Sequence, residues 1–376
     1  MKIVVASDSF KGSLTSSQVA QAVEQAVGQL VPDCQVVGLS IADGGEGLVE
    51  ALAEATSADY YWPIVSDPLQ RPVAAKYARV GTTAFIEMAA ASGLTLLKPS
   101  EYNPVLTSTY GTGELILHAL QHGCRQFVIG LGGSATNDAG VGMLQALGYR
   151  FYNAGGEVIT HCSGGALAEI ARIDDAMVPV ELAQAEFIVA SDVNIPFVGS
   201  QGAAQVFAHQ KGADDEMVAL LDAGMAAFAQ VIVQTTGVDV KEIAGAGAAG
   251  GLGAALYAFL GAEMRSGIDV VLDIIGFDEK ISDADLVITG EGKLDYQTAT
   301  GKAPAGVLAH AKKQDIPVVA IAGCVEICKE LEQMGFAGIY ATAPAGQSLD
   351  IAMQPDVAIE NIKHTMSRVL EAFRMK

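Results

Sequence analysis

The order of predicted strands and helices changes twice along the 376-residue chain, and this change constrains the fold more than any single motif. Short apolar strands alternate with helices up to about residue 60, and the same alternation returns after about residue 283. Between them, strands are predicted at residues 61–65, 73–80 and 84–88 with no helix separating them. Strand–helix alternation is typical of a parallel sheet covered by helices, whereas strands joined by short turns indicate antiparallel pairing.

These patterns predict an α/β protein with two domains. Residues 1–60 and 283–376 form a discontinuous Rossmann- or flavodoxin-like domain with a doubly wound parallel sheet, and residues 61–282 form a second α/β domain, with a mixed sheet, inserted into it. The first predicted helix has a capping box, because Gln18 follows Thr15 by three residues. Its apolar residues recur every three to four positions, as expected for a helix with one buried face.

The charge of the chain excludes one class of partner. It has 22 Lys and Arg residues against 43 Asp and Glu residues, a net charge of −21. Such a surface repels phosphates, so we expect no nucleic-acid partner, and an anionic small ligand requires local cations, backbone amides or a metal.

The cysteines and the apolar segments bear on the compartment. Five cysteines, an odd number spread along the chain, indicate reduced thiols in a cytoplasmic protein. The apolar run at residues 3–6 is too short for a signal peptide, and the uncharged stretch at residues 243–262 is mostly Gly and Ala. We therefore expect a cytoplasmic protein with no membrane partner.

Open parallel sheets bind ligands beyond the carboxyl ends of their strands, and polar loops follow several predicted strands. The first loop combines a cation, two hydroxyls and helix amides, which together favour an anion site over a capped turn with a solvated lysine. Its candidate residues are Asp8, Ser9, Lys11, Gly12 and Ser13. The second loop comprises residues 43–47. Its glycines allow a ligand to approach the backbone closely, and its carboxylates could bind Mg²⁺ or a hydroxyl, the alternative being a flexible surface turn. Its candidates are Asp43, Gly44 and Gly45.

The third loop, residues 130–140, follows a strand and opens a helix. Its amides and hydroxyls could bind a phosphate or a carboxylate, the alternative being a purely structural glycine turn. The candidates are Gly132, Gly133, Ser134, Thr136 and Asn137.

The fourth loop places a lysine between two carboxylates after the strand at residues 286–289, and either a functional site or a salt-bridged turn fits this pattern. Its candidates are Gly290, Glu291, Gly292, Lys293 and Asp295.

Asp192 follows the strand at residues 187–190 and is a candidate base or metal ligand, the alternative being an Asx-turn.

Other motifs are weaker. The Walker A pattern is not met at Gly292-Lys293 or at Gly301-Lys302, and no Gly-x-Ser-x-Gly elbow supports a hydrolase. Residues 245–250 match the dinucleotide pattern GxGxxG, but they follow a poor strand.

Five motifs in order make the whole chain similar to the bacterial glycerate kinase family, of the glycerate 2-kinase type. They lie at residues 3–13, 42–47, 86–94, 132–138 and 289–295. The resemblance implies two α/β domains, one Rossmann- or flavodoxin-like, with the active site in the interdomain cleft. It also implies ATP-dependent phosphorylation of D-glycerate, with 2-phosphoglycerate as the favoured product, in the breakdown of glyoxylate, glucarate and galactarate.

Phosphoryl transfer requires positioning and charge neutralisation more than covalent help, which suggests roles for the candidates. Mg²⁺ is expected with ATP. Lys11 and the amides of residues 132–136 are assigned to phosphate or carboxylate binding, with Lys293 as a second cation. Asp192 is the first choice for the base that orients the substrate hydroxyl, and Asp8 the second. Candidates for metal or hydroxyl contacts are Asp43, Glu291 and Asp295.

Two other classes stay open. One is a nicotinamide-dependent oxidoreductase of a small hydroxy acid that uses residues 245–250. The other is a non-catalytic protein that binds a small acid.

Overall fold

The structure is a computed structural model that describes residues 1–374. The chain divides into two compact units. Unit 1 comprises residues 1–43, 50–56 and 266–376, and unit 2 comprises residues 44–49 and 57–265. These bounds differ from those expected, since residues 266–282 fall in unit 1. The reason is that this segment forms two helices, and the first packs so closely on a later helix of unit 1 that a Cβ added at Gly306 would lie only 2.7 Å from the side chain of Ile268.

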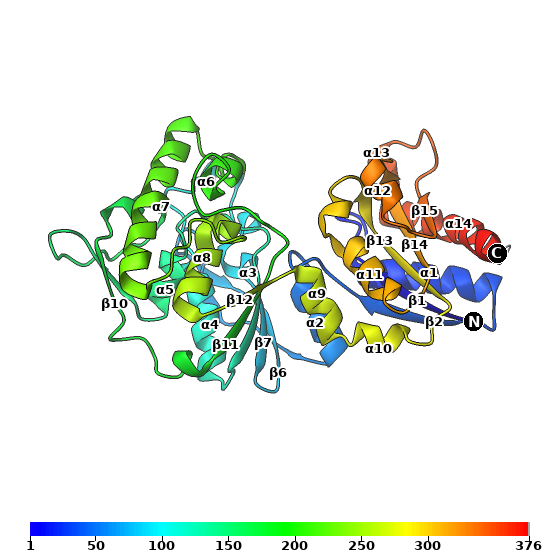
Figure 1. The fold of residues 1–376 in the computed structure, drawn as a ribbon, viewed down its shortest axis with the longest axis horizontal. Coiled ribbons are helices and arrows are strands. Elements are labelled where there is room, and N and C mark those ends of the chain that lie inside the picture. Colours follow the sequence, from blue (N-terminus) through cyan, green and yellow to red (C-terminus); the bar gives the residue numbers. More distant parts are fainter. Residues whose placement is uncertain (375–376) are drawn as a thin grey trace. The chain divides into compact units, whose positions relative to one another are not determined.

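Unit 1 is built on a five-stranded parallel sheet with the strand order β15-β14-β13-β1-β2 (Figure 1). Its strands are β1 (Lys2–Ser7), β2 (Gln35–Ser40), β13 (Leu286–Leu294), β14 (Val318–Val325) and β15 (Gly338–Ala341). Counted along unit 1, this is the flavodoxin-like order 2-1-3-4-5, with its switch point between β1 and β13. The prediction of a Rossmann- or flavodoxin-like parallel sheet is confirmed.

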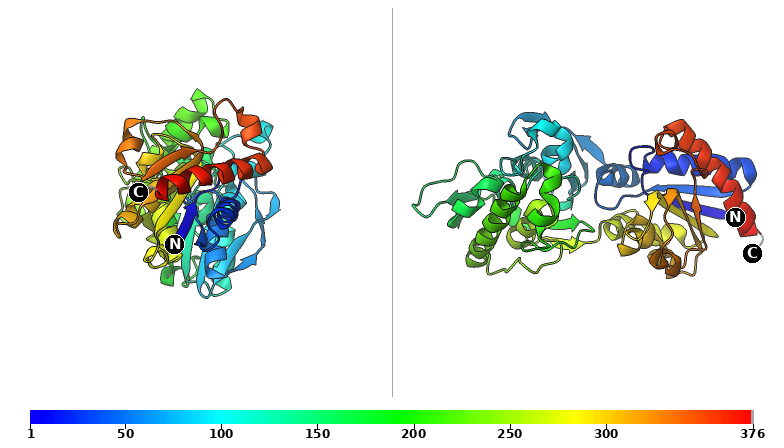
Figure 2. Two further views of the ribbon diagram at one scale, coloured as in Figure 1. Left: turned by 90° about the vertical axis from the view of Figure 1, so that its right-hand side faces the viewer. Right: turned by 90° about the horizontal axis from the view of Figure 1, so that it is seen from above.

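Helices cover both faces of this sheet. Figure 2 shows α1 and α14 on one face and the helices α9 to α11 on the other. The helices are α1 (Ser16–Leu30), α2 (Leu48–Thr56), α9 (Gly267–Ile274), α10 (Phe277–Ile281), α11 (Ala303–Lys312), α12 (Lys329–Gln333), α13 (Leu349–Ala352) and α14 (Pro355–Arg374). The predicted capping box of α1 is confirmed, because Gln18 N donates to Thr15 Oγ1 at 3.2 Å while the Gln18 side chain accepts from Thr15 N at 2.9 Å.

Unit 2 contains a six-stranded sheet with the order β12-β11-β8-β7-β6-β3. The pairs among β12, β11, β8 and β7 are parallel, and those from β7 through β6 to β3 are antiparallel, so the predicted mixed sheet is confirmed. Its strands are β3 (Asp59–Tyr61), β6 (Tyr77–Val80), β7 (Thr83–Glu87), β8 (Gln126–Gly130), β11 (Glu186–Ala190) and β12 (Glu263–Arg265). Two hairpins lie outside it, formed by β4 (Ile64–Ser66) with β5 (Pro72–Ala74) and by β9 (Arg150–Tyr152) with β10 (Arg172–Asp174).

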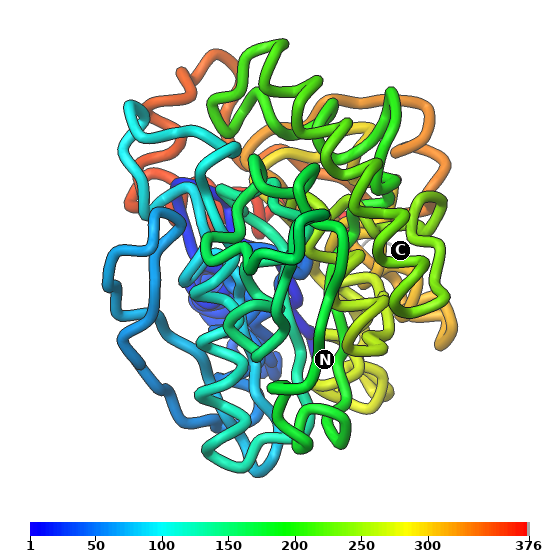
Figure 3. The backbone as a smooth tube through the Cα atoms, turned by 90° about the vertical axis from the view of Figure 1, so that its left-hand side faces the viewer, coloured from blue at the N-terminus to red at the C-terminus, as the bar shows by residue number. Residues whose placement is uncertain are grey.

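The helices of unit 2 enclose an apolar core, and Figure 3 follows its backbone from cyan through green. They are α3 (Ala89–Ser92), α4 (Tyr110–Gln121), α5 (Val141–Ala146), α6 (Ala203–Phe207), α7 (Asp215–Thr236) and α8 (Ala248–Leu260). By length and composition alone, α7 is apolar enough to cross a membrane. Leu221, Met225 and Phe228 along it are nevertheless fully buried in the core of unit 2, as in an ordinary core helix.

Three predicted strands have different bounds in the structure. The segment at residues 61–65 is divided between β3 and β4 at Pro63, and the segment at residues 73–80 is divided between β5 and β6. The third strand, β13, continues from residue 289 to Leu294, because its pairing with β14 extends as far as Leu294 opposite Val325. Residues 290–293 therefore belong to a strand, where the sequence predicted a loop.

Candidate active site

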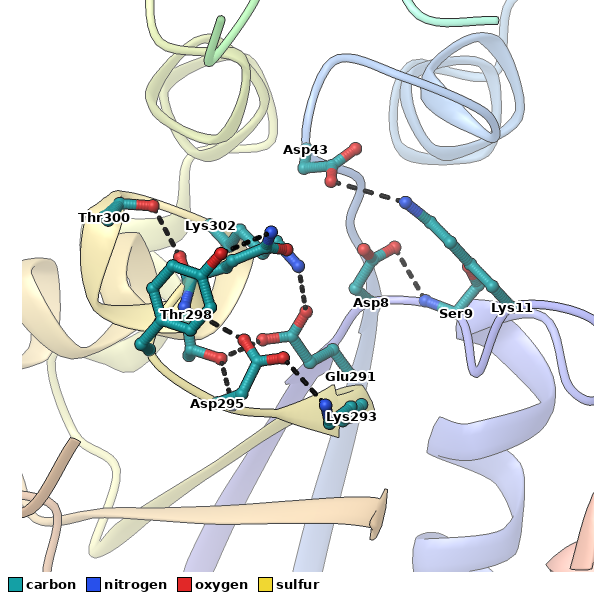
Figure 4. Close-up of polar contacts among 12 residues, drawn as sticks. Asp8, Ser9, Lys11, Asp43, Glu291, Lys293, Asp295, Thr298, Thr300 and Lys302 are labelled. Atoms are coloured by element: carbon teal, nitrogen blue, oxygen red, sulfur yellow. Dashed lines mark hydrogen bonds and ion pairs between the residues drawn. The ribbon is translucent and has the colours of Figure 1, made fainter. Parts of the chain in front are cut away.

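The carboxyl end of β1 and the part of β13 beside it form a polar edge of the unit 1 sheet. Ser7 pairs with Gly290, and the backbone N–H of Asp8 donates to the carbonyl oxygen of Gly290 at 2.9 Å. Asp8 and Glu291 follow directly and are 4% and 7% exposed. This is the switch point of the sheet, where open α/β sheets bind their ligands. The first and fourth predicted segments thus meet within unit 1 (Figure 4).

Lys11 supplies a cation beside this edge. Its Nζ lies 3.6 Å from Oδ2 of Asp43, and its side chain is 59% exposed. Partial burial opposes the charge of Lys11, but the carboxylates of Asp43 and Asp8 outweigh it and raise the pKa of Lys11. The ammonium is therefore charged at neutral pH, and its exposure leaves it open to an incoming anion. The first and second predicted loops meet through this pair.

Asp8 is a buried carboxyl group with a raised pKa. Burial and the nearby charge of Asp43 raise its pKa to about 7, although a hydrogen bond from Ser9 N at 2.7 Å and the charge of Lys11 oppose the rise. The charge of Glu291 adds to the increase. In Figure 4, Asp8 lies between the Lys11–Asp43 pair and the Glu291–Lys302 pair. A further cation at this edge would favour its ionised form.

Glu291 is held by two residues that the sequence analysis did not single out. Thr298 Oγ1 donates to Glu291 Oε1 at 2.6 Å, and Lys302 Nζ lies 3.5 Å from Glu291 Oε2. Burial raises the pKa of Glu291 even though Thr298 and Lys302 oppose the rise. Lys302 directly precedes α11. The sequence signal for Lys302 was its position after Gly301 and directly before a helix that begins Ala-Pro. The Walker A pattern did not reveal it, because that pattern also requires a Ser or Thr after the lysine and a glycine five residues before Gly301.

Lys293 has two acidic partners. Its Nζ lies 2.7 Å from Glu326 Oε2 and 3.3 Å from Asp295 Oδ2. Asp295 in turn accepts a hydrogen bond from Gln297 N at 2.9 Å. The salt-bridged alternative for this segment is thus present in the structure. Lys302, with Glu291 as its one ion-pair partner among the described residues, has less of its charge compensated than Lys293.

The carboxylates of this edge fit a hard cation of the Mg²⁺ type. Burial and mutual repulsion among Asp8, Asp43 and Glu291 concentrate negative charge at one place, and carboxylate oxygen is the donor that Mg²⁺ prefers. Within residues 1–374, no group of three or more His, Cys, Asp or Glu side chains is arranged to hold a metal ion. A Mg²⁺ ion at this edge would therefore be held by one or two protein carboxylates, with water and substrate phosphates completing its shell.

The third predicted loop lies in unit 2 and is closely packed. A Cβ at Gly132 would lie 2.6 Å from the Cα of Gly45, and one at Gly130 would lie 2.7 Å from the carbonyl oxygen of Gly44. Glycine is therefore needed here because residues 44–45 pack directly on this loop. Gly133, with φ of 75°, adopts a left-handed conformation that favours glycine.

Asp138 fixes the end of this loop from inside. It is fully buried and accepts hydrogen bonds from both N and Oγ1 of Thr109, at 2.7 and 2.8 Å, and from the amides of Gly140 and Gly142. Burial raises the pKa of Asp138, and these four donors oppose the rise. The acid thus serves as an internal anchor of the loop.

Three further polar residues line the loop. Ser134 is 8% exposed, and Thr136 and Asn137 are fully buried. Thr136 Oγ1 and Asn137 Oδ1 have no hydrogen-bond partner among the described residues. The side chain of the buried Lys211 contacts the backbone of this loop at Thr136. The sequence analysis missed Lys211, because the residues next to it in the sequence give no sign that it is buried.

Asp192 follows β11 in unit 2. Ala190 at the end of β11 pairs with Gly130 at the end of β8, so Asp192 and the glycine-rich loop leave the same edge of that sheet. Asp192 is half-buried, and the turn that contains it is closed by Ser191, whose Oγ accepts from Val193 N at 3.3 Å.

The candidate residues are therefore distributed over both units. Unit 1 holds Asp8, Ser9, Lys11, Gly12, Ser13, Asp43, Gly290, Glu291, Gly292, Lys293 and Asp295. Unit 2 holds Gly44, Gly45, Gly132, Gly133, Ser134, Thr136, Asn137 and Asp192.

The GxGxxG match at residues 245–250 has a packing role. Between β11 and β12 the described residues contain no strand, so the segment lacks the strand that a dinucleotide fingerprint follows. A Cβ at Gly250 would lie 2.1 Å from the carbonyl oxygen of Thr136. The glycine allows this segment to pack against the loop at residues 130–140.

Comparison with known proteins gives a consistent result over the whole chain. The sequence model of the Glycerate kinase family matches residues 3–374. A glycerate kinase of Bacillus cereus is 46% identical, covering 100% of this chain and 98% of the relative. The glycerate 2-kinase of Escherichia coli K12 is 45% identical, covering 94% of this chain and 93% of the relative. A crystal structure described as a glycerate kinase 2 from Salmonella typhimurium LT2 has a TM-score of 0.88 and 43% identity, with 100% of both chains covered. This chain belongs to the glycerate kinase family.

Proposed function

We propose that this protein transfers the γ-phosphoryl group of ATP to D-glycerate in the presence of Mg²⁺ and forms 2-phosphoglycerate. The observation that carries the proposal is the match of residues 3–374 to the Glycerate kinase family. The 45% identity to a protein named glycerate 2-kinase supports the 2-phospho product.

Electrostatics explains why the polar edge of unit 1 suits this reaction. ATP and glycerate are both anions, and two unit charges 4 Å apart repel by roughly 4 kcal/mol at an effective dielectric of about 20. In a chain with a net charge of −21, neutralisation has to be local. Lys11 and Lys302 are the cations that we assign to phosphate binding. Lys293, held by two carboxylates, is assigned a supporting role.

Mg²⁺, when bound, neutralises the charge on the transferring phosphates. Asp43 and Glu291 would hold it, since these two acids lie beside Asp8 at the switch point of the sheet. Thr298 and Lys302 orient Glu291 by contacting its two carboxylate oxygens separately. We assign Asp295 to orienting Lys293, because its own oxygens already accept from Gln297 N and pair with Lys293.

The residues of unit 2 are assigned to the same reaction. The amides of residues 132–136 bind a phosphate or carboxylate oxygen, as successive backbone N–H groups do in glycine-rich loops. Asp192 is the proposed base that orients the substrate hydroxyl, and Asp8 is the alternative. The proposal therefore requires functional residues from both units. All five cysteines are free, which fits a protein that works in the reducing cytoplasm.

Turnover with defined substrates tests the proposal. ADP formation is followed with ATP and Mg²⁺, with D-glycerate, with L-glycerate and without an acceptor. ADP formation that depends on D-glycerate is expected. Binding of D-glycerate without ATP consumption would instead indicate a non-catalytic binding protein. Turnover of D-glycerate that requires a nicotinamide cofactor would indicate an oxidoreductase.

A further inference from the structure

Lys211 is a buried cation beneath the glycine-rich loop of unit 2. Its side chain lies at the end of a short 3₁₀ turn, His209–Lys211, and the residue is 2% exposed. Its Nζ donates to the carbonyl oxygen of Thr136 at 2.6 Å, across 75 residues of sequence. Among the described residues, this carbonyl is its one hydrogen-bond partner.

Burial of this ammonium costs free energy, which its hydrogen bond to Thr136 and the Phe207 ring, 6.0 Å from Nζ, offset only in part. Burial lowers the pKa of Lys211 to about 7, and the charge of Asp138 acts in the opposite direction. Asp138 already accepts four hydrogen bonds from Thr109, Gly140 and Gly142, so it does not depend on the lysine. An apolar side chain of similar length would avoid the desolvation penalty but would leave the buried carbonyl oxygen of Thr136 without its side-chain donor. The function of the buried lysine in the fold is therefore to hold this one carbonyl.

The contact determines where two unusual polar side chains lie. Thr136 Oγ1 and Asn137 Oδ1 are buried without a hydrogen-bond partner, although buried polar groups are nearly always paired. Asn137 Nδ2 instead contacts the sulfur of Met225 at 3.1 Å. Lys211 and Gly250 both contact the carbonyl oxygen of Thr136 and so fix the backbone that bears these side chains. Unpaired polar atoms on a rigidly held backbone are what a preorganised ligand contact requires.

We propose that Lys211 is a positioning residue for the phosphoryl transfer: its Nζ holds the Thr136 carbonyl, and thereby holds in place the Thr136 hydroxyl, which can donate to an anionic reactant, and the Asn137 amide oxygen, which can accept from a substrate hydroxyl. This inference rests on the proposed function. It assigns Lys211 no contact with substrate.

A double-mutant cycle separates positioning from a general structural role. Lys211→Met and Thr136→Val are made singly and together, and kcat and KM for both substrates are measured. Lys98→Met, at an exposed lysine of unit 2, is the matched control. We expect Lys211→Met to lower kcat/KM by about 10–100-fold, because small displacements of a reactive constellation have effects of that size. Its Tm should stay within about 4 °C of the wild type, and Lys98→Met should stay within about twofold in activity.

The decisive result is the coupling between the two sites. If Lys211 acts through Thr136, the double variant loses no more activity than the worse single variant, and Lys211→Met and Thr136→Val change kcat and KM in the same pattern. The proposal would be overturned if the loss of kcat/KM in the double variant equalled the product of the losses in the two single variants. It would also be overturned if Lys211→Met kept an activity within twofold of the wild type.

A second variant covers the case in which Lys211→Met does not fold. Lys211→Gln is uncharged but keeps an N–H donor for the Thr136 carbonyl, so it should retain at least about a fifth of wild-type kcat/KM. A folded Lys211→Gln enzyme with more than 100-fold loss would contradict the positioning role.

Failure of the proposed function would be visible separately, as a wild-type enzyme inactive with D-glycerate. In that case, hydrogen exchange of the amides at residues 130–140 still tests the inference. We expect at least about tenfold faster exchange in Lys211→Met than in Lys98→Met, and equal rates would overturn it.

Discussion

Asp8, directly after β1, and Glu291, within the neighbouring parallel strand β13, lie at the same level of the sheet, because the N–H of Asp8 donates to the carbonyl oxygen of Gly290 at 2.9 Å. Two acids separated by more than 280 residues in the sequence thus share one buried edge. Their burial and mutual repulsion make this edge of unit 1 a place where bound cations are favoured.

The raised pKa of Asp8 predicts a pH-dependent cost to stability. The pKa rises from 3.8 to about 7 on folding, so the folded protein binds this proton more tightly than the unfolded chain does. Stability is therefore lost as the pH rises from about 4 to 7, by up to about 4 kcal/mol at 1.36 kcal/mol per pKa unit. We expect Asp8→Asn to raise the free energy of unfolding, and to raise it more at pH 8 than at pH 5.

Urea unfolding at the two pH values measures this effect. Asp33→Asn, at an exposed acid of unit 1, is the control and should show no such difference. An Asp8→Asn variant less stable than the wild type at pH 8 would be incompatible with the environment described for Asp8.

Lys11→Met tests the exposed cation of the site. Removing a charge that neutralises phosphate should lower kcat/KM by at least about tenfold, with Lys313→Met as the exposed control in the same unit. If the loss is within threefold, which corresponds to only about 0.65 kcal/mol, Lys11 does not have the assigned role.

Thr298→Val tests the support of Glu291. The valine removes the 2.6 Å hydrogen bond to Glu291, leaving a buried carboxylate oxygen without that donor, and also removes the acceptor of the Asp295 N–H at 3.1 Å. We expect a loss of about 1–3 kcal/mol in the free energy of unfolding, measured in urea. Thr300→Val is the matched control, because that exposed hydroxyl donates only to the carbonyl oxygen of Gln297, and it should cost less. Equal costs would show that the Glu291 contact adds nothing.

Asp192→Asn tests the proposed base. The amide keeps the shape of the side chain but cannot accept a proton from the substrate hydroxyl, so kcat should fall by at least about 100-fold. Asp175→Asn, at an exposed acid of unit 2, should remain active. A folded Asp192→Asn enzyme with full activity would transfer the role to Asp8, the second candidate.

Local sequence signals predicted much of the fold. The capping box of Thr15 and Gln18 forms as expected, because both of its hydrogen bonds depend only on residues four positions apart or fewer. The parallel sheet of unit 1 followed from strand–helix alternation. The end of β13 could not be predicted in this way, because Gly290 and Gly292 are typical turn residues. They continue the strand only because β13 pairs with β14 as far as Leu294.

Long-range contacts account for what the sequence missed in the site. Lys302 and Thr298 become important only because they fold back onto Glu291, and Lys211 because it reaches Thr136. The loop at residues 130–140 was interpreted as a site for a phosphate or carboxylate or as a structural glycine turn, and the group that approaches Gly130 and Gly132 in the structure is the backbone of Gly44 and Gly45. No local pattern distinguishes a glycine that contacts a ligand from one that contacts another segment of the same chain.

Phosphorus-31 NMR of the reaction products tests the central claim most directly. The enzyme is incubated with ATP and D-glycerate, with Mg²⁺ and with excess EDTA, and the products are compared with authentic 2- and 3-phosphoglycerate. We predict ADP and 2-phosphoglycerate in equal amounts with Mg²⁺ and neither with EDTA. Formation of 3-phosphoglycerate would contradict the assigned product, and the absence of any phosphoglycerate would contradict the proposed function itself.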